Sequence, residues 1–307
     1  MKIIAAALLA LTTFCLRVAQ PAAMVTLRAP AVVQVGAAWS IEVNVSDTAA
    51  GERVTLMLFS GLDHFAQTVV TGTGGVARWD LPQGMITQAG EALIIGRYGD
   101  EETRRTVRVL PGRATEADLI TTANALLAYG NARGTLIALL RDSFGNPPRS
   151  STETLITITY PNGETVDFTL PQRVGLSWTP FESQGSPGRV RAHVQADQAE
   201  AALELRQMPG EAARITLEVS PSCTASDGRD TIHLSAEAED AHGFPVVDGT
   251  LIRFAIGDGF ALGRTANGTT AIGIPAPTEM GLHRFRATSG SAQSAVEWLR
   301  ITDGVCP

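Results

Sequence analysis

Along most of the chain, hydrophobic and polar residues alternate one by one in short runs that end at turn residues. A period of two predicts β-strands with one buried and one exposed face, as at 39–45 and 232–238. The pattern predicts an all-β chain with strands at 25–27, 39–45, 54–58, 76–81, 92–98, 103–110, 135–139, 155–159, 166–170, 190–194, 201–205, 215–219, 232–238, 250–256, 270–274, 284–287 and 295–301.

One turn recurs at a fixed distance. Asp142-Ser-Phe-Gly-Asn-Pro147 reappears 98 residues later as Asp240-Ala-His-Gly-Phe-Pro245, and Pro111 and Pro209 keep the same separation, as do Gly130 and Gly228. Such a period, with many short strands in each unit, is typical of tandem β-sandwich modules. We therefore expect three modules, at 24–111, 112–209 and 210–307, of which the first is the most diverged.

The segment 116–128 is ambiguous, because it contains many helix-forming residues and few residues that break a helix. The third module has the alternating run 215–219 in the matching place. We therefore expect a strand there as well.

Residues 1–23 have the features of a secretory signal peptide. Lys2 precedes an uncharged, mostly apolar run over 3–16, which is shorter than the ~20 residues of a comfortable membrane-spanning helix. We expect cleavage between Ala19 and Ala23, no membrane span in the mature chain, and a location in the periplasm or at the cell surface. The formal net charge of −7 disfavours a nucleic-acid partner, which needs a basic face.

Three cysteines occur, and Cys15 lies in the predicted signal peptide. Cys223 and Cys306 lie near the beginning and the end of the third module. In an exported protein such a pair predicts a disulfide, and no C-x-x-C spacing suggests a redox or metal role.

The motifs of the second and third modules resemble the bacterial Ig-like repeats of the invasin and intimin type. The stretches that carry this resemblance are 216–228, 240–245 and 267–274 in the third module and 141–147 in the second. The resemblance implies Ig-like β-sandwiches that act as spacers or adhesive stalks at a bacterial cell surface.

The repeated aspartates are the main candidates for chemistry. Asp142 and Asp240, with Asp47 as a weaker third, could bind calcium between modules, or each could accept hydrogen bonds from the amides of its own turn. Calcium requires six to eight oxygen ligands, and the turns carry too few acids, so we favour the second role.

The sequence offers little else for catalysis. Its five histidines are scattered, and it contains neither a G-x-S-x-G elbow nor a glycine-rich phosphate loop. We therefore predict a non-enzymatic protein without a cofactor, although an accessory domain of an enzyme is a weaker alternative.

Contact surfaces are expected in end loops, and the candidate residues are His64, Phe65, Tyr160 and Asn162. We expect the four tryptophans, Trp39, Trp79, Trp178 and Trp298, to pack in the cores. The predicted function is a structural or interaction module of the cell envelope that contacts an envelope protein or a surface glycan. The alternative is a carbohydrate-binding or adhesive protein that uses its end loops or exposed tryptophans.

Overall fold

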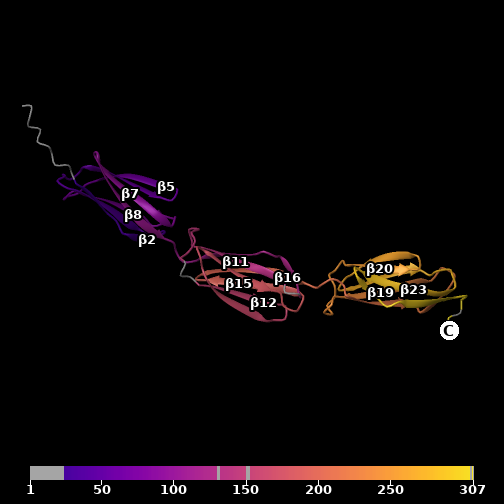
Figure 1. Ribbon diagram of the computed structural model, residues 1–307. Helices are drawn as coiled ribbons and strands as arrows, with labels where there is room; N and C mark the ends of the chain where they lie inside the picture. Colours follow the sequence, from indigo (N-terminus) through magenta and orange to yellow (C-terminus); the bar gives the residue numbers. More distant parts are fainter. Residues whose placement is uncertain (1–23, 130–131, 150–152, 305, 307) are drawn as a thin grey trace, which may run out of the picture. The chain divides into compact units, whose positions relative to one another are not determined.

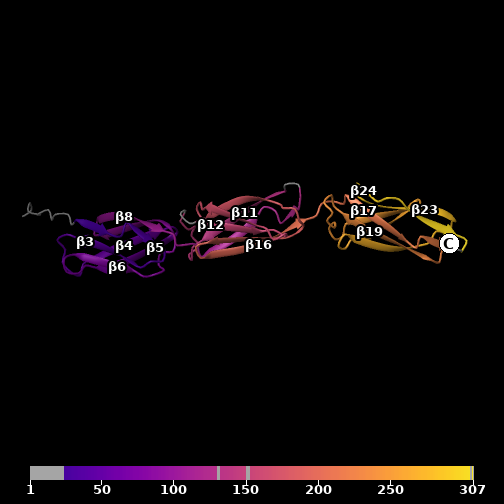
Figure 2. The same ribbon diagram turned by 90° about the horizontal axis from the view of Figure 1, so that it is seen from below.

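The computed structural model describes residues 24–129, 132–149, 153–304 and 306, so the predicted signal peptide and Gly130 lie outside the described residues. All regular elements of the described chain are strands, and they form three Ig-like β-sandwiches (Figures 1 and 2). None of these described residues belongs to a helix that could cross a membrane.

The first sandwich contains eight strands in two sheets. Its strands are β1 (Val25–Arg28), β2 (Val32–Gln34), β3 (Trp39–Val45), β4 (Arg53–Ser60), β5 (Asp63–Val70), β6 (Val76–Leu81), β7 (Gly90–Tyr98) and β8 (Glu101–Leu110). The short sheet has the order β1-β3-β6, and the long sheet has the order β2-β8-β7-β4-β5.

The second sandwich repeats this plan. Its strands are β9 (Glu116–Thr121), β10 (Ala125–Leu127), β11 (Arg133–Arg141), β12 (Glu153–Thr159), β13 (Thr165–Pro171), β14 (Leu176–Glu182), β15 (Gly188–Ala196) and β16 (Ala199–Met208). The short sheet is β14-β11-β9 and the long sheet is β10-β16-β15-β12-β13. The prediction of strand rather than helix within 116–128 is confirmed.

The third sandwich follows the same order with one added short strand. Its strands are β17 (Arg214–Ser220), β18 (Cys223–Ala225), β19 (Thr231–Glu239), β20 (Leu251–Ile256), β21 (Gly259–Arg264), β22 (Thr269–Pro275), β23 (Gly281–Ser289), β24 (Ala292–Gln293) and β25 (Glu297–Thr302). The short sheet is β17-β19-β22, and β18-β25-β23-β20-β21 form the long sheet, with β24 paired to β23.

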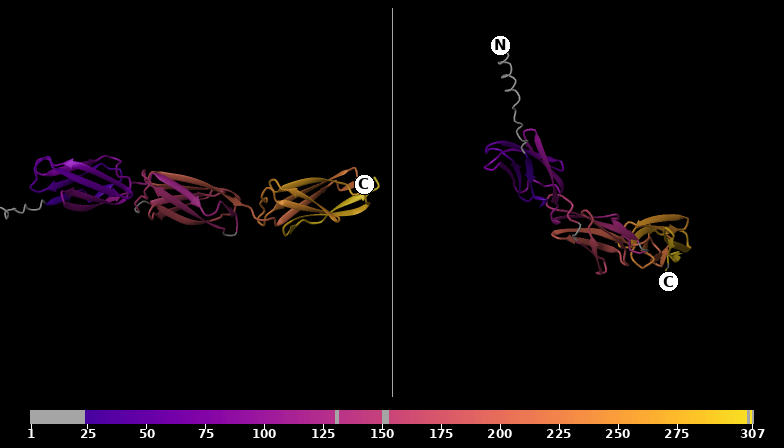
Figure 3. Two further views of the ribbon diagram at one scale, coloured as in Figure 1. Left: turned by 90° about the horizontal axis from the view of Figure 1, so that it is seen from above. Right: turned by 60° about the vertical axis from the view of Figure 1, so that its left-hand side comes forward.

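A shared topological detail supports the common plan. The short strands β2, β10 and β18 each pair in parallel with the last long strand of their sandwich, β8, β16 and β25. The chain therefore changes sheets at the same point in all three sandwiches. Figure 3 shows the sandwiches from two further sides. The prediction of three tandem Ig-like sandwiches is confirmed by this repeated topology.

Each sandwich has its own core, built from the buried phase of the alternating strands. Ile41 and Leu56 are fully buried in the first, Leu136 and Ile156 in the second, and Phe254 in the third. Burying one such aliphatic side chain stabilises the fold by about 1.5–3 kcal/mol.

The described chain divides into two compact units. The first contains the described residues up to Arg113 together with Arg141–Arg149, and the second contains Ala114–Leu140 and the described residues that follow position 150. The turn that contains Asp142 therefore belongs to the same compact unit as the first sandwich.

The alternation of hydrophobic and polar residues did not predict several strands that the structure contains. β5 (DHFAQTVV) has little alternation, β14 contains Pro180, and β21 contains two glycines. Each of these strands lies at the edge of its sheet, where proline and glycine are tolerated because one side of the strand is unpaired.

Candidate functional site

The recurring turn holds a buried aspartate directly after the central strand of the short sheet. Asp142 follows β11 and Asp240 follows β19, and their exposed fractions are 1% and 3%. In each turn the glycine three residues later has a positive φ, 81° at Gly145 and 84° at Gly243, which favours glycine. The amide of that glycine donates to the carbonyl of the aspartate and closes the turn.

In the first of the two turns, the carboxylate of Asp142 accepts hydrogen bonds from several donors. Oδ2 accepts from the Gly112 amide at 2.8 Å, and Oδ1 accepts from the amides of Phe144 and Asn146 at 2.9 Å each. The side-chain amide of Asn146 also donates to both oxygens, at 3.1 and 3.2 Å. The carboxylate thus joins the turn to the Pro111-Gly112 linker.

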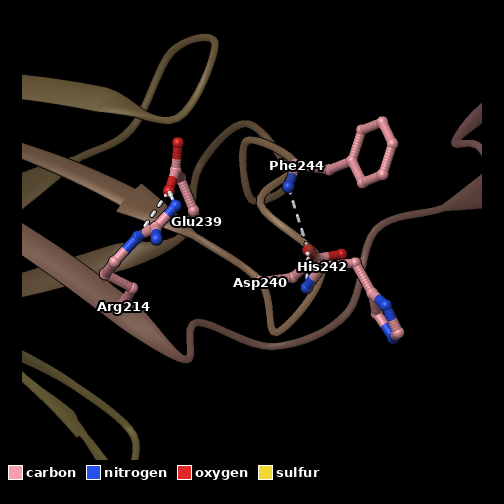
Figure 4. Close-up of polar contacts among 5 residues, drawn as sticks. All are labelled: Arg214, Glu239, Asp240, His242 and Phe244. Carbon is pink, nitrogen blue, oxygen red and sulfur yellow. Dashed lines mark hydrogen bonds and ion pairs between the residues drawn. The ribbon is translucent and has the colours of Figure 1, made fainter.

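The second turn repeats this arrangement (Figure 4). The Asp240 Oδ2 accepts from the Gly210 amide at 3.0 Å, and its Oδ1 accepts from the amides of His242 and Phe244 at 2.9 and 3.0 Å. Beside the turn, Arg214 forms an ion pair with Glu239. We call this arrangement, in which one buried aspartate accepts from its turn and from the preceding Pro-Gly linker, the linker clamp.

The hydrogen bonds of the second linker clamp affect the pKa of its aspartate, Asp240. Burial of the Asp240 carboxyl raises its pKa, but three backbone N–H donors and the nearby imidazole of His242 lower it by more. The pKa of Asp240 therefore lies below its ordinary value, and the carboxylate is held in its charged form.

Both aspartates direct their oxygens at N–H donors rather than at a common metal position. Among the described residues, no group of three or more histidine, cysteine or acidic side chains could hold a metal ion. The hydrogen bonds fit the expected turn role of Asp142 and Asp240.

The first sandwich uses a different residue in the equivalent place. Ser46 follows β3, and its hydroxyl accepts from the Met24 amide at 2.9 Å. Asp47 lies next to it in the turn with φ at 57°. A neutral hydroxyl thus takes the position that the buried carboxylate occupies in the other two sandwiches.

The two clamps differ in the side chains that surround them. In the first compact unit, Asn146 donates to the Thr87 carbonyl at 2.8 Å and accepts from the Ala89 amide at 2.9 Å. The ring of Phe144 lies so close to Gly36 that a Cβ there would come within 2.5 Å of it.

In the second compact unit, the ring of His242 stacks on Tyr129 with centroids 3.5 Å apart and planes 16° apart. Phe244 lies against the same tyrosine, with centroids 5.6 Å apart. Burial raises the pKa of the Tyr129 hydroxyl, and the Asp240 carboxylate raises it further. The second turn therefore packs through aromatic rings at both positions. The first turn has a ring at one position, Phe144, and the side-chain amide of Asn146 at the other.

The predicted disulfide is confirmed. Cys223 and Cys306 are bonded, with Cα atoms 5.8 Å apart and a sequence separation of 83. The bond joins β18 to the segment that follows β25, and closing such a loop stabilises a fold by about 4 kcal/mol at most.

The predicted contact residues lie in different environments. His64 and Phe65 lie within β5 rather than in a loop, with His64 exposed and Phe65 packed against the first core. Asn162 is exposed and bonds to Glu164 within its hairpin.

Tyr160, which we predict as a contact residue of an end loop, is buried rather than exposed. Its exposed fraction is 5%, and its hydroxyl donates to the Glu182 carbonyl at 2.8 Å. Tyr160 follows β12 directly and continues the alternation of its buried residues, Ile156 and Ile158. It lines a groove of about 430 Å³ together with Arg133 and Phe168.

The prediction that all four tryptophans are buried is wrong for two of them. Trp79 is buried and Trp39 packs against the first core, as expected. Trp178 and Trp298, however, have exposed fractions of 48% and 56%. Both fall on the outward phase of their strands, because the neighbouring residues, such as Leu299, take the buried positions.

Comparison with known proteins supports the fold. No protein-family model and no curated protein sequence matches the chain. The crystal structure of invasin, a bacterial integrin-binding protein, aligns with a TM-score of 0.54 and 16% identity over 91% of this chain and 60% of that chain. This chain thus spans about 60% of the length of invasin.

Two further solved structures align more weakly. The D1–D4 ectodomain fragment of ICAM-5 has a TM-score of 0.43 and 12% identity, covering 92% of this chain and 77% of that chain. The adhesin InvE of Yersinia pseudotuberculosis has a TM-score of 0.32 and 18% identity, covering 62% and 60%. The invasin alignment confirms the expected likeness to invasin-type Ig-like repeats at the level of fold.

Proposed function

We propose that this chain is an exported, non-enzymatic Ig-like protein of the bacterial cell envelope, whose sandwiches act as structural and interaction modules. The observation that carries the proposal is the pair of linker clamps, since both buried aspartates serve to hold Pro-Gly linkers. In both turns the hydrogen bonds from backbone amides to the carboxylate give the aspartate a structural role.

An adhesive role has support from the exposed apolar surface. Trp178 pairs across the short sheet of the second sandwich with Ile137, and Ile120 on β9 of that sheet is 47% exposed. Exposed apolar residues gathered on one sheet face are typical of an interaction surface. Invasin is a bacterial integrin-binding protein, and we propose adhesion for this chain on the basis of its own surface.

The proposal of export and envelope location is supported by the sequence of residues 1–23 and by the disulfide. The apolar run over 3–16 is typical of a signal peptide, and a disulfide between Cys223 and Cys306 persists in an oxidising compartment.

The test is expression of the full chain in a Gram-negative host, with a matched variant that lacks residues 2–23. We expect the full chain in the envelope fraction, cleaved between Ala19 and Ala23, and the deletion variant in the cytoplasm with free thiols. Recovery of uncleaved full-length chain in the cytoplasm would contradict the proposal.

A further inference from the structure

The outer face of the long sheet in the third sandwich carries five exposed arginines. Phe254, Phe285 and Leu299 take the buried phase of β20, β23 and β25, so the residues between them point outward. We call this surface the cationic face, and its arginines are Arg253, Arg264, Arg284, Arg286 and Arg300.

Aromatic side chains alternate with these arginines. The strand register places Trp298 directly across from Arg284, and Phe260 directly across from Ala255, which in turn pairs with Arg286. Trp298 and Phe260 are 56% and 57% exposed. The guanidinium of Arg253 lies over the Phe260 ring, 4.6 Å from its centroid, and so fixes the ring on the surface.

The centre of the cationic face is hollowed. A shallow cavity of about 190 Å³ lies over Ala255 and is lined by Arg284, Arg286 and Val296, among others. Arg284 and Arg286 thus border a space of a size suited to one compact anionic group, and Trp298 and Phe260 are the strand partners of Arg284 and Ala255.

The five arginines have no acidic partner within the part of the chain that the structure describes. Arg286 donates to the side chain of Gln293 at 3.1 Å and Arg264 donates to the Gly249 carbonyl at 3.2 Å, and both acceptors are neutral. The nearest acids by sequence are Glu297 and Asp303, each three residues from Arg300. Asp248, Asp258 and Glu279 follow, each five residues from Arg253 or Arg284.

The second sandwich provides an internal comparison. On the equivalent face, Arg191 and Arg189 both pair with Glu204, at 2.9 and 3.6 Å. The arginines of the second sandwich thus share an acidic partner, whereas those of the cationic face have none among the described residues, in a chain whose net charge is −7.

We infer that the cationic face binds an acidic polysaccharide whose repeating units carry carboxylate or sulfate groups. Guanidinium groups bind such anions through paired hydrogen bonds, and flat aromatic rings pack against the apolar faces of sugar rings. Alternating arginines and aromatic rings match a polymer in which acidic groups and ring faces alternate. This inference rests on the proposed adhesive function and names its ligand class.

A protein partner is less well matched to this surface. The buried centre of a protein interface is a continuous apolar area from which charged side chains other than arginine are depleted. On the cationic face the centre is occupied by Arg284 and Arg286, and the apolar side chains, such as Leu282 and Leu262, are separated by arginines.

The experiment measures binding of the mature, disulfide-bonded full chain to dextran sulfate, alginate, neutral dextran and polyglutamate. The variants are R284A/R286A and W298A, with R189A/R191A and F59A as matched controls on other faces. All of these residues are exposed, and equal thermal unfolding temperatures will show that the fold is retained.

We expect binding to at least one acidic polysaccharide and none to neutral dextran. R284A/R286A should weaken binding at least tenfold and W298A about threefold to tenfold, while both control variants bind like the unaltered chain. A loss for W298A separates sugar stacking from charge attraction alone, because the tryptophan carries no charge.

Three results would overturn the inference: no binding to either acidic polysaccharide, equal losses in the control variants, or polyglutamate binding as tight as polysaccharide binding. The last would assign the face to an acidic protein. An envelope-located chain that fails this test would leave the proposed function standing and remove only its ligand.

Discussion

The two linker clamps share a backbone and differ in the side chains around it. In both, a buried aspartate accepts the amide of a Pro-Gly linker, residue 112 or 210, at 2.8–3.0 Å. The positions two and four residues later differ, with Phe144 and Asn146 in one turn and His242 and Phe244 in the other. The comparison teaches that the aspartate fixes the linker, while these two neighbours determine which groups pack on the turn.

Removing the aspartate should have the largest effect and should be similar at both turns. Asp142→Ala and Asp240→Ala each leave three partly buried amides without their acceptor, and one unsatisfied buried group costs about 1–3 kcal/mol. We expect a loss of about 3 kcal/mol of unfolding free energy in urea for the unit concerned. Asp→Asn should cost less, since one carbonyl oxygen remains. A loss below about 1 kcal/mol at either turn would contradict the shared role.

Asn146→Ala should distinguish the first clamp from the second. The substitution removes the bonds of the side-chain amide to Thr87 and Ala89, which have no equivalent at Phe244. We expect about 2 kcal/mol less stability in the first compact unit, measured by urea unfolding. The matched control is Asn162→Ala in an exposed hairpin, which should change stability by less than about 0.5 kcal/mol.

The aromatic contact of the second turn should contribute less to the free energy of unfolding than the Asn146 side chain contributes in the first turn. Tyr129→Leu removes the stacked ring against His242, and an aromatic pair contributes about 0.5–1.5 kcal/mol beyond its buried area. A double-mutant cycle with His242→Ala should give a coupling energy of about 1 kcal/mol. Additive losses would show that the two rings are independent.

The smallest effect should appear on acidification. Because the pKa of Asp240 is lowered in the folded state, its carboxylate contributes stability that is present above the pKa of the unfolded chain. That contribution is lost as the pH falls through the lowered folded pKa. The stability difference between the unaltered chain and Asp240→Asn, measured by urea unfolding, should therefore shrink as the pH falls from 6 towards about 3. A difference that is independent of pH would contradict this assignment.

Much of the fold could be predicted from the sequence, because alternation and turn spacing are local properties. The repeat of Asp142 at Asp240 predicted the sandwiches, and the placement of Cys223 and Cys306 predicted the disulfide. Edge strands such as β14 were not predicted, because Pro180 is unusual in a strand sequence. At the edge of a sheet the proline is nevertheless tolerated.

The candidate surfaces were harder to predict, because they depend on which phase of a strand faces the core. Trp298 was assigned to the core as a hydrophobic residue, yet Leu299 and Ile301 occupy the buried phase. The spacing Arg284-x-Arg286 beside Trp298-x-Arg300 was a usable signal, since residues two apart on a strand share a face. Joining the two pairs into one surface required the register of β23 and β25.

Amide exchange of Gly112 and Gly210 tests the linker clamp most directly. In the ¹⁵N-labelled full chain, both amides should exchange slowly, each should become fast when its own aspartate is changed to alanine, and neither should respond to calcium or a chelator. Fast exchange of either glycine in the unaltered chain, or protection that appears only with calcium, would contradict the account.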